Sequence, residues 1–224
     1  EYLDSASFYL SYTHFQDGEY DQAIPTFTDL KNRKEYREDA TFYPMLSNFL
    51  QGDIDGNIDE ARDYLISYPN SKNTAEVYRL LGNSYYRKGN MDGAIDAYQN
   101  YVYRESNPNR EDMYQLADAY YRKQMYDNAI QNLNGVATTG DMVGQAGNML
   151  LGLSYLKVND NQSAATAFDA AASVTYDRSI SEKALYNYVI LANRNGSSAF
   201  NEAVSASQRF FNEYPSSQYT NDVS

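Results

Sequence analysis

Residues 78–98 read YRLLGNSYYRKGNMDGAIDAY, and the predicted fold depends on this stretch. Tyr78, Leu81 and Tyr85 recur at spacings of three and four, so they fall on one face of a predicted helix. A glycine and an asparagine then end that helix, and Asp92 falls in the first turn of a second helix, where negative charge is favourable. The stretch therefore predicts two antiparallel helices joined by a short turn.

The two predicted helices carry small residues at corresponding places. Gly82 lies on the first helix and Ala94 on the second. A close crossing of two helices requires small side chains at the crossing point, while larger aromatic residues fill the groove beside them. We therefore expect the pair to pack closely at Gly82 and Ala94.

A four-residue pattern that ends in alanine recurs along the whole chain. Its alanines are Ala23, Ala61, Ala94, Ala129, Ala164 and Ala203. The spacings between them are 38, 33, 35, 35 and 39 residues, close to the period of about 34 residues of one class of helical repeat. Because a single helix pair cannot bury its apolar face, the pattern predicts helix pairs stacked on one another.

These residues resemble the tetratricopeptide repeat, whose pattern is a large aromatic, Leu-Gly, Tyr, a mid-repeat Gly, Ala, Phe and a late Pro. The resemblance implies an all-α fold, an α-α superhelix or solenoid of about six antiparallel helix pairs, in a single domain over residues 1–224. The expected repeats are roughly 3–36, 39–72, 73–108, 110–140, 143–178 and 181–217. The second and sixth repeats depart from the pattern, through Asn48-Phe49 in place of Leu-Gly, through Pro44, and through a longer turn at residues 195–198.

Two turns carry a further resemblance. Residues 68–71 read YPNS and residues 214–217 read YPSS, which looks like an ending common in periplasmic assembly and coordinator proteins of bacteria. The run from Asp141 to Tyr188 resembles large many-repeat proteins of Bacteroidetes. These likenesses imply a periplasmic or outer-membrane-associated location, with the cytoplasm as the alternative. No polar capping helix is evident after the second turn, so we expect the chain to be a segment of a longer array.

The composition bears against several classes of function. The formal charge is −12, from 30 acidic and 18 basic residues, and no basic stripe offsets it, so a nucleic-acid partner is unfavourable. No apolar run approaches the length of about 18 residues that a membrane-spanning helix needs, so this segment is not expected to insert into a membrane. The chain has no cysteine, which excludes disulfides, thiolate metal sites and cysteine nucleophiles.

The resemblance also supplies candidate binding residues on the first helices of the third and fourth repeats, where the family lines its concave groove. Those positions are Arg79, Asn83, Tyr86, Arg87, Tyr114, Asp118, Tyr121 and Arg122. Arginine and aromatic side chains often anchor interfaces. The alternative is that they are ordinary solvated helix residues.

Chaperone-binding members of the family grip a carboxylate with basic and asparagine residues on three successive first helices. Arg79 and Asn83 match the first part of that clamp. The fifth repeat carries only apolar residues where the clamp should continue, namely Ala146, Met149, Leu150 and Leu153. The clamp is therefore incomplete, and a mixed aromatic and apolar groove suits an extended segment or a helix better.

No pattern points to catalysis, to a cofactor or to a metal. The sequence lacks a nucleophile elbow, a phosphate-binding loop and a histidine pair. His14, the only histidine, is expected to pack in the core. The stretch Asp53–Asp59 resembles the start of a calcium loop, but its glycine is at the fourth position and Tyr64 is at the twelfth, so we expect a turn with Asp59 near the helix start.

We therefore expect a non-catalytic scaffold that binds a protein or peptide in the concave groove, in bacterial envelope assembly. The first alternative is a structural envelope module that self-associates through its convex face or its ends. A remote alternative is a hydrolase of envelope polymers. Exposed apolar residues gathered around Tyr86, Tyr114 and Tyr121 would favour groove binding, and the same residues gathered at the chain ends would favour self-association. No pattern identifies the partner or an oligomeric state.

Overall fold

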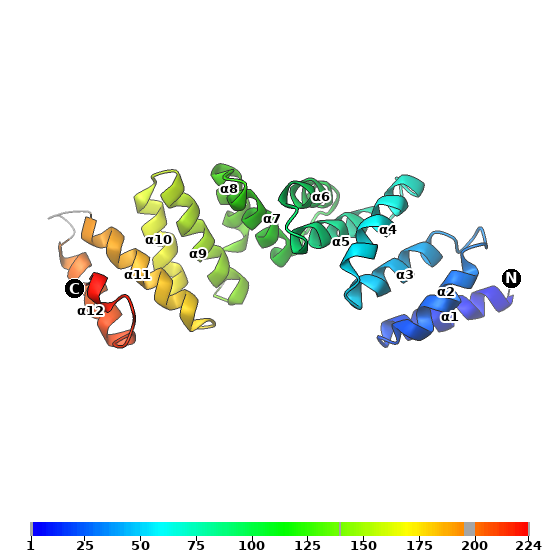
Figure 1. The fold of residues 1–224 in the computed structure, drawn as a ribbon, viewed down its shortest axis with the longest axis horizontal. Helices are drawn as coiled ribbons and strands as arrows, with labels where there is room; N and C mark the ends of the chain where they lie inside the picture. Colours follow the sequence, from blue (N-terminus) through cyan, green and yellow to red (C-terminus); the bar gives the residue numbers. More distant parts are fainter. Residues whose placement is uncertain (1, 139, 195–199, 224) are drawn as a thin grey trace. The chain divides into compact units, whose positions relative to one another are not determined.

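The structure is a computed structural model of the chain, and it describes residues 2–138, 140–194 and 200–223. Over these residues it contains thirteen α-helices (Figure 1), which belong to two compact units, residues 1–108 and 109–224. The predicted all-α class with about six antiparallel helix pairs is confirmed. The longer turn expected at residues 195–198 lies outside the described residues.

The first unit consists of three helix pairs. Its helices are α1 (Tyr2–Gln16), α2 (Tyr20–Leu30), α3 (Asp39–Leu50), α4 (Ile54–Ser67), α5 (Thr74–Arg87) and α6 (Met91–Arg104). Each helix packs against the next one along the chain, so the second helix of one pair also contacts the first helix of the following pair. Pro44 lies inside α3, and the helix continues past it to Leu50.

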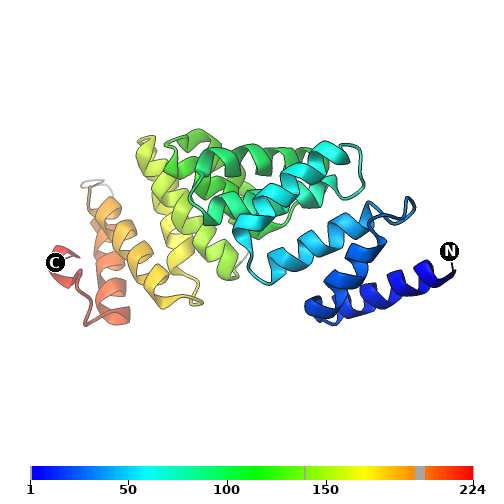
Figure 2. The same cartoon turned by 45° about the vertical axis from the view of Figure 1, so that its right-hand side comes forward.

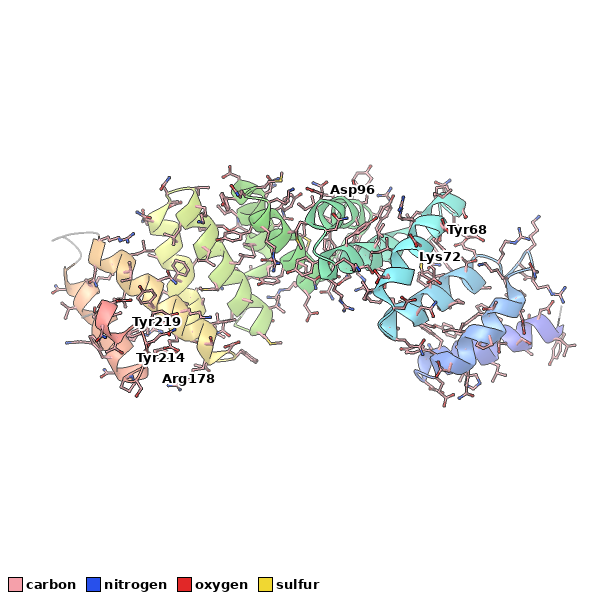
Figure 3. All side chains as sticks on the ribbon, in the orientation of Figure 1. Tyr68, Lys72, Asp96, Arg178, Tyr214 and Tyr219 are labelled. Atoms are coloured by element: carbon pink, nitrogen blue, oxygen red, sulfur yellow. The ribbon has the colours of Figure 1, made fainter. Side chains whose placement is uncertain are left out.

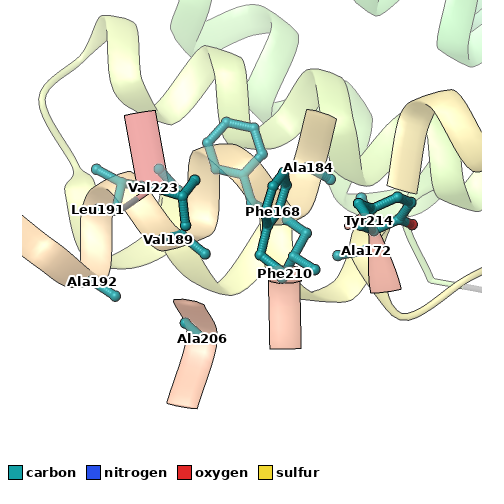
Figure 4. Packing of buried hydrophobic residues seen from close by; sticks show 13 residues of the cluster. Phe168, Ala172, Ala184, Val189, Leu191, Ala192, Ala206, Phe210, Tyr214 and Val223 are labelled. Carbon is teal, nitrogen blue, oxygen red and sulfur yellow. The ribbon is translucent and has the colours of Figure 1, made fainter. Parts of the chain in front are cut away.

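The second unit has three further pairs and a short final helix. Its helices are α7 (Arg110–Arg122), α8 (Tyr126–Val136), α9 (Met142–Lys157), α10 (Asn161–Ala172), α11 (Arg178–Arg194), α12 (Phe200–Glu213) and α13 (Thr220–Val223). In both ribbon views α10 and α11 lie next to each other (Figures 1 and 2). Phe168 and Phe210 belong to the buried cluster that joins α10, α11 and α12 (Figure 4).

The turn inside each of the first five pairs contains one residue in the left-handed region. In the first unit this residue is a glycine, namely Gly18, Gly52 and Gly89, with φ of 77°, 95° and 76°. In the second unit it is Gln124 or Asn159, each with φ of 62°. A left-handed residue just past a helix C-terminus satisfies the last carbonyls of the helix and turns the chain back. It also marks the same place in each of these five pairs.

Counting from the left-handed residue identifies equivalent buried positions. Seven residues before it, the first helix carries a residue of variable size, which is Ser11, Met45, Gly82, Ala117 or Gly152. Sixteen residues further on, the second helix carries Phe27, Ala61, Tyr98, Leu133 or Phe168. All ten are buried. A large residue on one helix thus accompanies a smaller one on the other.

Gly82 shows why the two positions depend on each other. A Cβ atom added to Gly82 would lie 2.7 Å from Cδ1 of Tyr98, and one added to Gly152 would lie 2.6 Å from Cε1 of Phe168. Real Cβ atoms do not approach a neighbour this closely, so the aromatic ring occupies the space that a side chain would need. The close packing predicted at Gly82 is confirmed by its contact with Tyr98, and Ala94 on α6 is fully buried.

The alignment of the second repeat on Ala61 was wrong by one helical turn. The side chain of Asp53 accepts a hydrogen bond from the backbone N–H of Gly56, as that of Asn90 does from Gly93. Counting four residues from each cap shows that Asn57 is the equivalent of Ala94. Counting eight residues shows that Ala61 is the equivalent of Tyr98. Asn57 is fully buried, and its Oδ1 accepts a hydrogen bond of 2.8 Å from Ser84.

Two further expectations near helix ends are corrected. Asp53, rather than Asp59, caps α4, which begins at Ile54. His14 is half-buried rather than part of the core, and its Nδ1 lies 2.5 Å from a carboxylate oxygen of Glu19. A charged neighbour at the surface suits an imidazole better than an apolar core does.

The start of α11 is held by a buried side chain from α9. Gln145 is fully buried; its Nε2 donates to the carbonyl of Val174 at 2.6 Å, and its Oε1 accepts from the N–H of Asp177 at 2.8 Å. Because both atoms of the amide are used, the loop before α11 is fixed against α9. Among the described residues, no helix combines the length and the apolar character needed to cross a membrane.

Candidate functional site

The four predicted residues on α5 lie on one face of the helix, at spacings of four, three and one. Arg79 is held along this face by Glu76, because its Nε and Nη2 donate to the two carboxylate oxygens at 2.7 and 2.5 Å. A two-point contact of this kind fixes the guanidinium plane. Arg79 keeps 28% of its side chain exposed, so the pair lies at the surface.

The other α5 residues differ in accessibility. Asn83 is only 5% exposed, and its Nδ2 donates to the carbonyl of Arg79 at 2.9 Å. Tyr86 is half-buried and Arg87 is exposed. The guanidinium carbon of Arg87 lies 5.2 Å from the ring centroid of Phe49, within range of a cation–π contact. Arg79, Tyr86 and Arg87 are therefore the accessible members, and Asn83 mainly supports the helix.

The four predicted residues on α7 also share one face. Asp118 is nearly buried, and one of its carboxylate oxygens accepts from Nε of Arg122 at 2.6 Å. Tyr114 is half-buried one turn earlier. Burial raises the pKa of Tyr114, and the negative charge of Asp118 adds to the rise while Arg122 opposes it. The hydroxyl of Tyr114 is therefore neutral over the whole physiological range.

Tyr121 on α7 forms an aromatic pair with a tyrosine of α8, the partner helix of the same pair. Its ring centroid lies 5.5 Å from that of Tyr126 on α8, with an edge-to-face angle of 63°. Such pairs are favourable beyond the area they bury, and they restrict both rings. The accessible members of the α7 face are Tyr114, Tyr121 and Arg122, since Asp118 is covered. The α5 and α7 residues belong to different units, and their role as a binding groove stays a prediction.

The apolar residues of the fifth repeat are used in packing. Leu150 is buried, and Met149 and Leu153 are partly buried against the core of the second unit. They cannot supply the polar groups of a carboxylate clamp. Among the described residues, no group of three or more histidine, cysteine or acidic side chains is placed to hold a metal ion.

Sequence reasoning missed two surface pockets of the second unit. One, of about 390 Å³, is lined by residues of α10, α11 and α12 and of the loop before α11: Ala172, Ser173, Thr175, Arg178, Ser181, Arg209, Glu213 and Tyr214. The other, of about 540 Å³, is polar and includes Asp169, Tyr188 and Glu202. Tyr188 donates to Glu202 at 2.9 Å, and burial followed by this bond raises its pKa to about 12. Only the Tyr-Pro turn at Tyr214 could have drawn attention to the first pocket.

Comparison with known proteins supports the repeat assignment. The tetratricopeptide repeat family model matches residues 55–111 and 80–140. No curated protein matches the sequence at a significant level. Solved structures of two tetratricopeptide-like chains share the fold at low sequence identity. YrrB, described as a TPR protein with an unusual peptide-binding site, has a TM-score of 0.68 and 13% identity, over 88% of this chain and 96% of its own.

MamA is the second similar structure. One MamA crystal structure has a TM-score of 0.63 and 21% identity, over 80% of this chain and 92% of its own, and another has 0.64 and 16%, over 77% and 92%. At these identities the likeness shows the fold alone. The family model matches residues 55–140, and the solved structures show that the described residues share the fold of paired helices.

Proposed function

We propose that this protein is a non-catalytic scaffold that binds another protein or a peptide, and that the accessible faces of α5 and α7 make the contact. The observation that carries the proposal is the surface of α5, where Arg79, Tyr86 and Arg87 are accessible on one side of the helix within the region matched by the family. The peptide-binding site attributed to YrrB supports the same class of function.

The contacts on α5 suit binding because two of its cations are already ordered. Glu76 fixes the guanidinium of Arg79, and the Phe49 ring lies within cation–π range of Arg87. Side chains that are ordered before binding lose less conformational entropy when a partner arrives. Arginine and tyrosine are also the residue types that most often carry the binding energy of an interface.

Photo-crosslinking tests the α5 assignment directly. A photoreactive phenylalanine analogue in place of Tyr86 is expected to capture the partner, whereas the same analogue in place of Tyr103 on α6, which is 87% exposed, is the matched control. Charge reversal by Arg79→Glu should reduce capture at position 86. Equal capture at both positions, undiminished by Arg79→Glu, would show that α5 is not the contact surface.

The α7 face is tested separately, because it belongs to the other unit. Tyr121→Ala removes one ring of the edge-to-face pair on this face, and Arg122→Glu reverses the accessible charge. Loss of the partner with these variants but not with Arg79→Glu would assign binding to α7 alone. Wild-type recovery of the partner with all three variants would reject both faces.

A role in the bacterial envelope is supported only by the two Tyr-Pro turns and by the resemblance of residues 141–188 to many-repeat proteins of Bacteroidetes. We propose on that ground a periplasmic or outer-membrane-associated scaffold for assembly, with the cytoplasm as the alternative. Fractionation of the native organism with an antibody against the chain decides between these locations. The hydrolase alternative gains no support from the described residues.

Self-association is favoured by a different observation. Four large apolar side chains on α1 are strongly exposed: Tyr2 at 89%, Leu3 at 79%, Tyr9 at 68% and Leu10 at 56%. By contrast, the tyrosines of the α5 and α7 faces are half-buried. Sedimentation of the wild type and of a Leu10→Glu variant tests this second function. A wild type that is monomeric at all concentrations would reject it.

A further inference from the structure

Helix α1 is apolar on two opposite sides, and its side chains extend both towards the neighbouring helices and away from the first unit (Figure 3). On the inner side the ring centroid of Phe8 lies 5.7 Å from that of Phe27 on α2, and the centroid of Phe15 lies 5.2 Å from that of Tyr43 on α3. The opposite side, which we call the outer face of α1, consists of exposed residues, namely Tyr2, Leu3, Ala6, Tyr9, Leu10 and Thr13. Because a helix that is apolar all round is normally buried, we expect another surface to cover the outer face.

Leu10 shows that this exposure departs from the rest of the fold. It lies eight residues before Gly18, and it is 56% exposed. The equivalent residues Leu81 on α5 and Leu151 on α9 are only 6% and 8% exposed. Leu81 belongs to a buried cluster that includes Ala61 on α4, the second helix of the preceding pair. Within the described part of the chain no helix pair precedes α1, so the cover for Leu10 has to come from elsewhere.

The outer face of α1 carries no charged side chain. The helix contains no lysine or arginine, and its one acidic residue, Asp4, is paired with Nε of Arg33 at 3.4 Å. The only polar side chain on the face is that of Thr13, whose hydroxyl donates to the carbonyl of Tyr9 at 2.9 Å. Burial of the face therefore leaves no polar side chain of α1 without a hydrogen bond, and a matching surface has to be apolar and uncharged as well.

We propose that the outer face of α1 packs against the same face of a second copy of this chain, with the two helices antiparallel and crossing at Ala6. The face is symmetric about this residue, because Tyr2 and Leu3 precede it by four and three residues. Tyr9 and Leu10 follow it by three and four residues. Each Tyr2 thus lies opposite Leu10 of the second copy, and each Leu3 lies opposite Tyr9. A contact with two-fold symmetry requires a self-complementary surface of this kind.

The size of the contact predicts a weak, reversible dimer. Ala6 lets the two helices approach closely, as Gly82 does within the α5/α6 pair. At about 150 Å² for each large side chain, the contact buries roughly 1,000 Å² in total, the lower end for a specific interface. We therefore expect a dissociation constant in the micromolar range. Because each copy carries a charge of −12, added salt should strengthen the dimer by screening the repulsion.

This proposal rests on the self-association that is given above as the second function. It names the surface and the partner for that function, and it does not depend on the α5 and α7 faces. The tests below therefore measure the dimer itself and the pairing of α1 separately.

Single cysteines test the pairing, because the chain has no cysteine of its own. In Ala6→Cys the two thiols lie near the two-fold axis, so air oxidation should convert the protein to a disulfide-linked dimer. The matched control is Thr13→Cys on the same face. Its two thiols are about 20 Å apart along the antiparallel helices, beyond the reach of a disulfide, so it should stay monomeric on a denaturing gel. Cross-linking of both variants, or of neither, would overturn the antiparallel pairing at Ala6.

Sedimentation equilibrium measures the dimer and its variants. Leu10→Glu should weaken association by at least about a hundredfold, because symmetry removes two buried leucines from each dimer. Ala6→Leu should weaken it by at least about tenfold although it adds apolar surface, since the larger side chain separates the crossing helices. The control is Ile66→Glu on α4, which alters an apolar residue that is 78% exposed and should leave the dissociation constant unchanged.

The outcomes separate this pairing from self-association in general. A dimer that persists in Leu10→Glu and Ala6→Leu, with melting temperatures like that of the wild type, would keep self-association and reject the outer face of α1. Tighter association of Ala6→Leu would show unspecific apolar contact and would also reject the pairing. A wild type that is monomeric at all concentrations would reject both the pairing and the second function.

Discussion

The pairs α3/α4 and α5/α6 occupy adjacent places in the first unit but use opposite sizes at the same two positions. In α5/α6 the first helix has Gly82 and the second has Tyr98, while in α3/α4 the first has Met45 and the second has Ala61. Met45 and Ala61 are buried in one cluster. A helix pair therefore keeps the combined volume of the two side chains rather than the identity of either, as close packing requires.

The largest expected effect is at the large member of the α5/α6 pair. Tyr98→Ala leaves a cavity against Gly82 that no side chain can fill, so we expect a loss of about 3–5 kcal/mol in the free energy of unfolding. Urea unfolding followed by circular dichroism measures it. The control is Ala61→Gly at the equivalent position of α4, which should cost only about 1 kcal/mol. Similar losses in the free energy of unfolding for the two variants would contradict the idea that the large residue lies on different helices in the two pairs.

A smaller effect is expected at the other member of the same pair. Gly82→Met drives a side chain into the Tyr98 ring and should cost about 1–3 kcal/mol, the range for overpacking. Combined with Tyr98→Ala it recreates the arrangement of Met45 and Ala61, so the double variant should be more stable than the sum of the two losses predicts. The double-mutant cycle should show at least about 1 kcal/mol of favourable coupling. Additive losses would mean that the two positions are independent.

The two pairs should also differ in their response to alkali. Burial, with smaller contributions from Tyr12 and Asp39, raises the pKa of Tyr43 on α3 to about 12, whereas the equivalent residue on α5 is Leu80. A raised pKa favours the protonated phenol in the folded state. Its stabilising contribution is therefore complete below the unfolded pKa of about 10 and is lost as the pH rises towards 12.

Replacing the phenol tests this pH dependence. Tyr43→Phe should flatten part of the decline in the free energy of unfolding between about pH 10 and pH 12, and it should change little at neutral pH. Tyr188→Phe should flatten the decline in the same way in the second unit, where the pKa of Tyr188 is also raised to about 12, but it should also cost about 1 kcal/mol at neutral pH because it removes the hydrogen bond to Glu202. If the free energy of unfolding declines with pH in both variants as it does in the wild type, groups other than these two tyrosines cause the decline.

The smallest effect concerns the turns. Gln124 adopts a left-handed conformation that Gly89 adopts in the α5/α6 pair. Gln124→Gly should therefore stabilise the protein by up to about 1 kcal/mol, and Gly89→Ala should destabilise it by about 1 kcal/mol, because a side chain is strained at positive φ. Thermal unfolding of both variants compares them. A shift in the same direction for both would contradict this explanation.

Much of the architecture was predictable because it depends on local patterns. Apolar spacings of three and four, and in the first three pairs a turn glycine before the second helix, indicate helix pairs without knowledge of their neighbours. The alignment of α4 was not predictable in this way. The repeated alanine predicts the crossing point at Ala61, but a buried asparagine, Asn57, occupies that place and Ala61 lies one turn later. A small residue alone does not fix the alignment of a repeat, and the caps at Asp53 and Asn90 are needed to choose between Asn57 and Ala61.

The candidate site was predictable only as a set of positions. Family positions select Arg79 and Asn83 alike, yet Arg79 lies at the surface and Asn83 is covered.

The sequence by itself determined that this protein consists of paired helices, because the spacing of apolar residues and the turn residues act over a few positions of the chain. The tertiary structure decided which side chain fills each crossing and which polar groups are covered. Those properties depend on residues that are far apart in the sequence, 16 positions for Gly82 with Tyr98 and 27 for Asn57 with Ser84, and only folding brings them together.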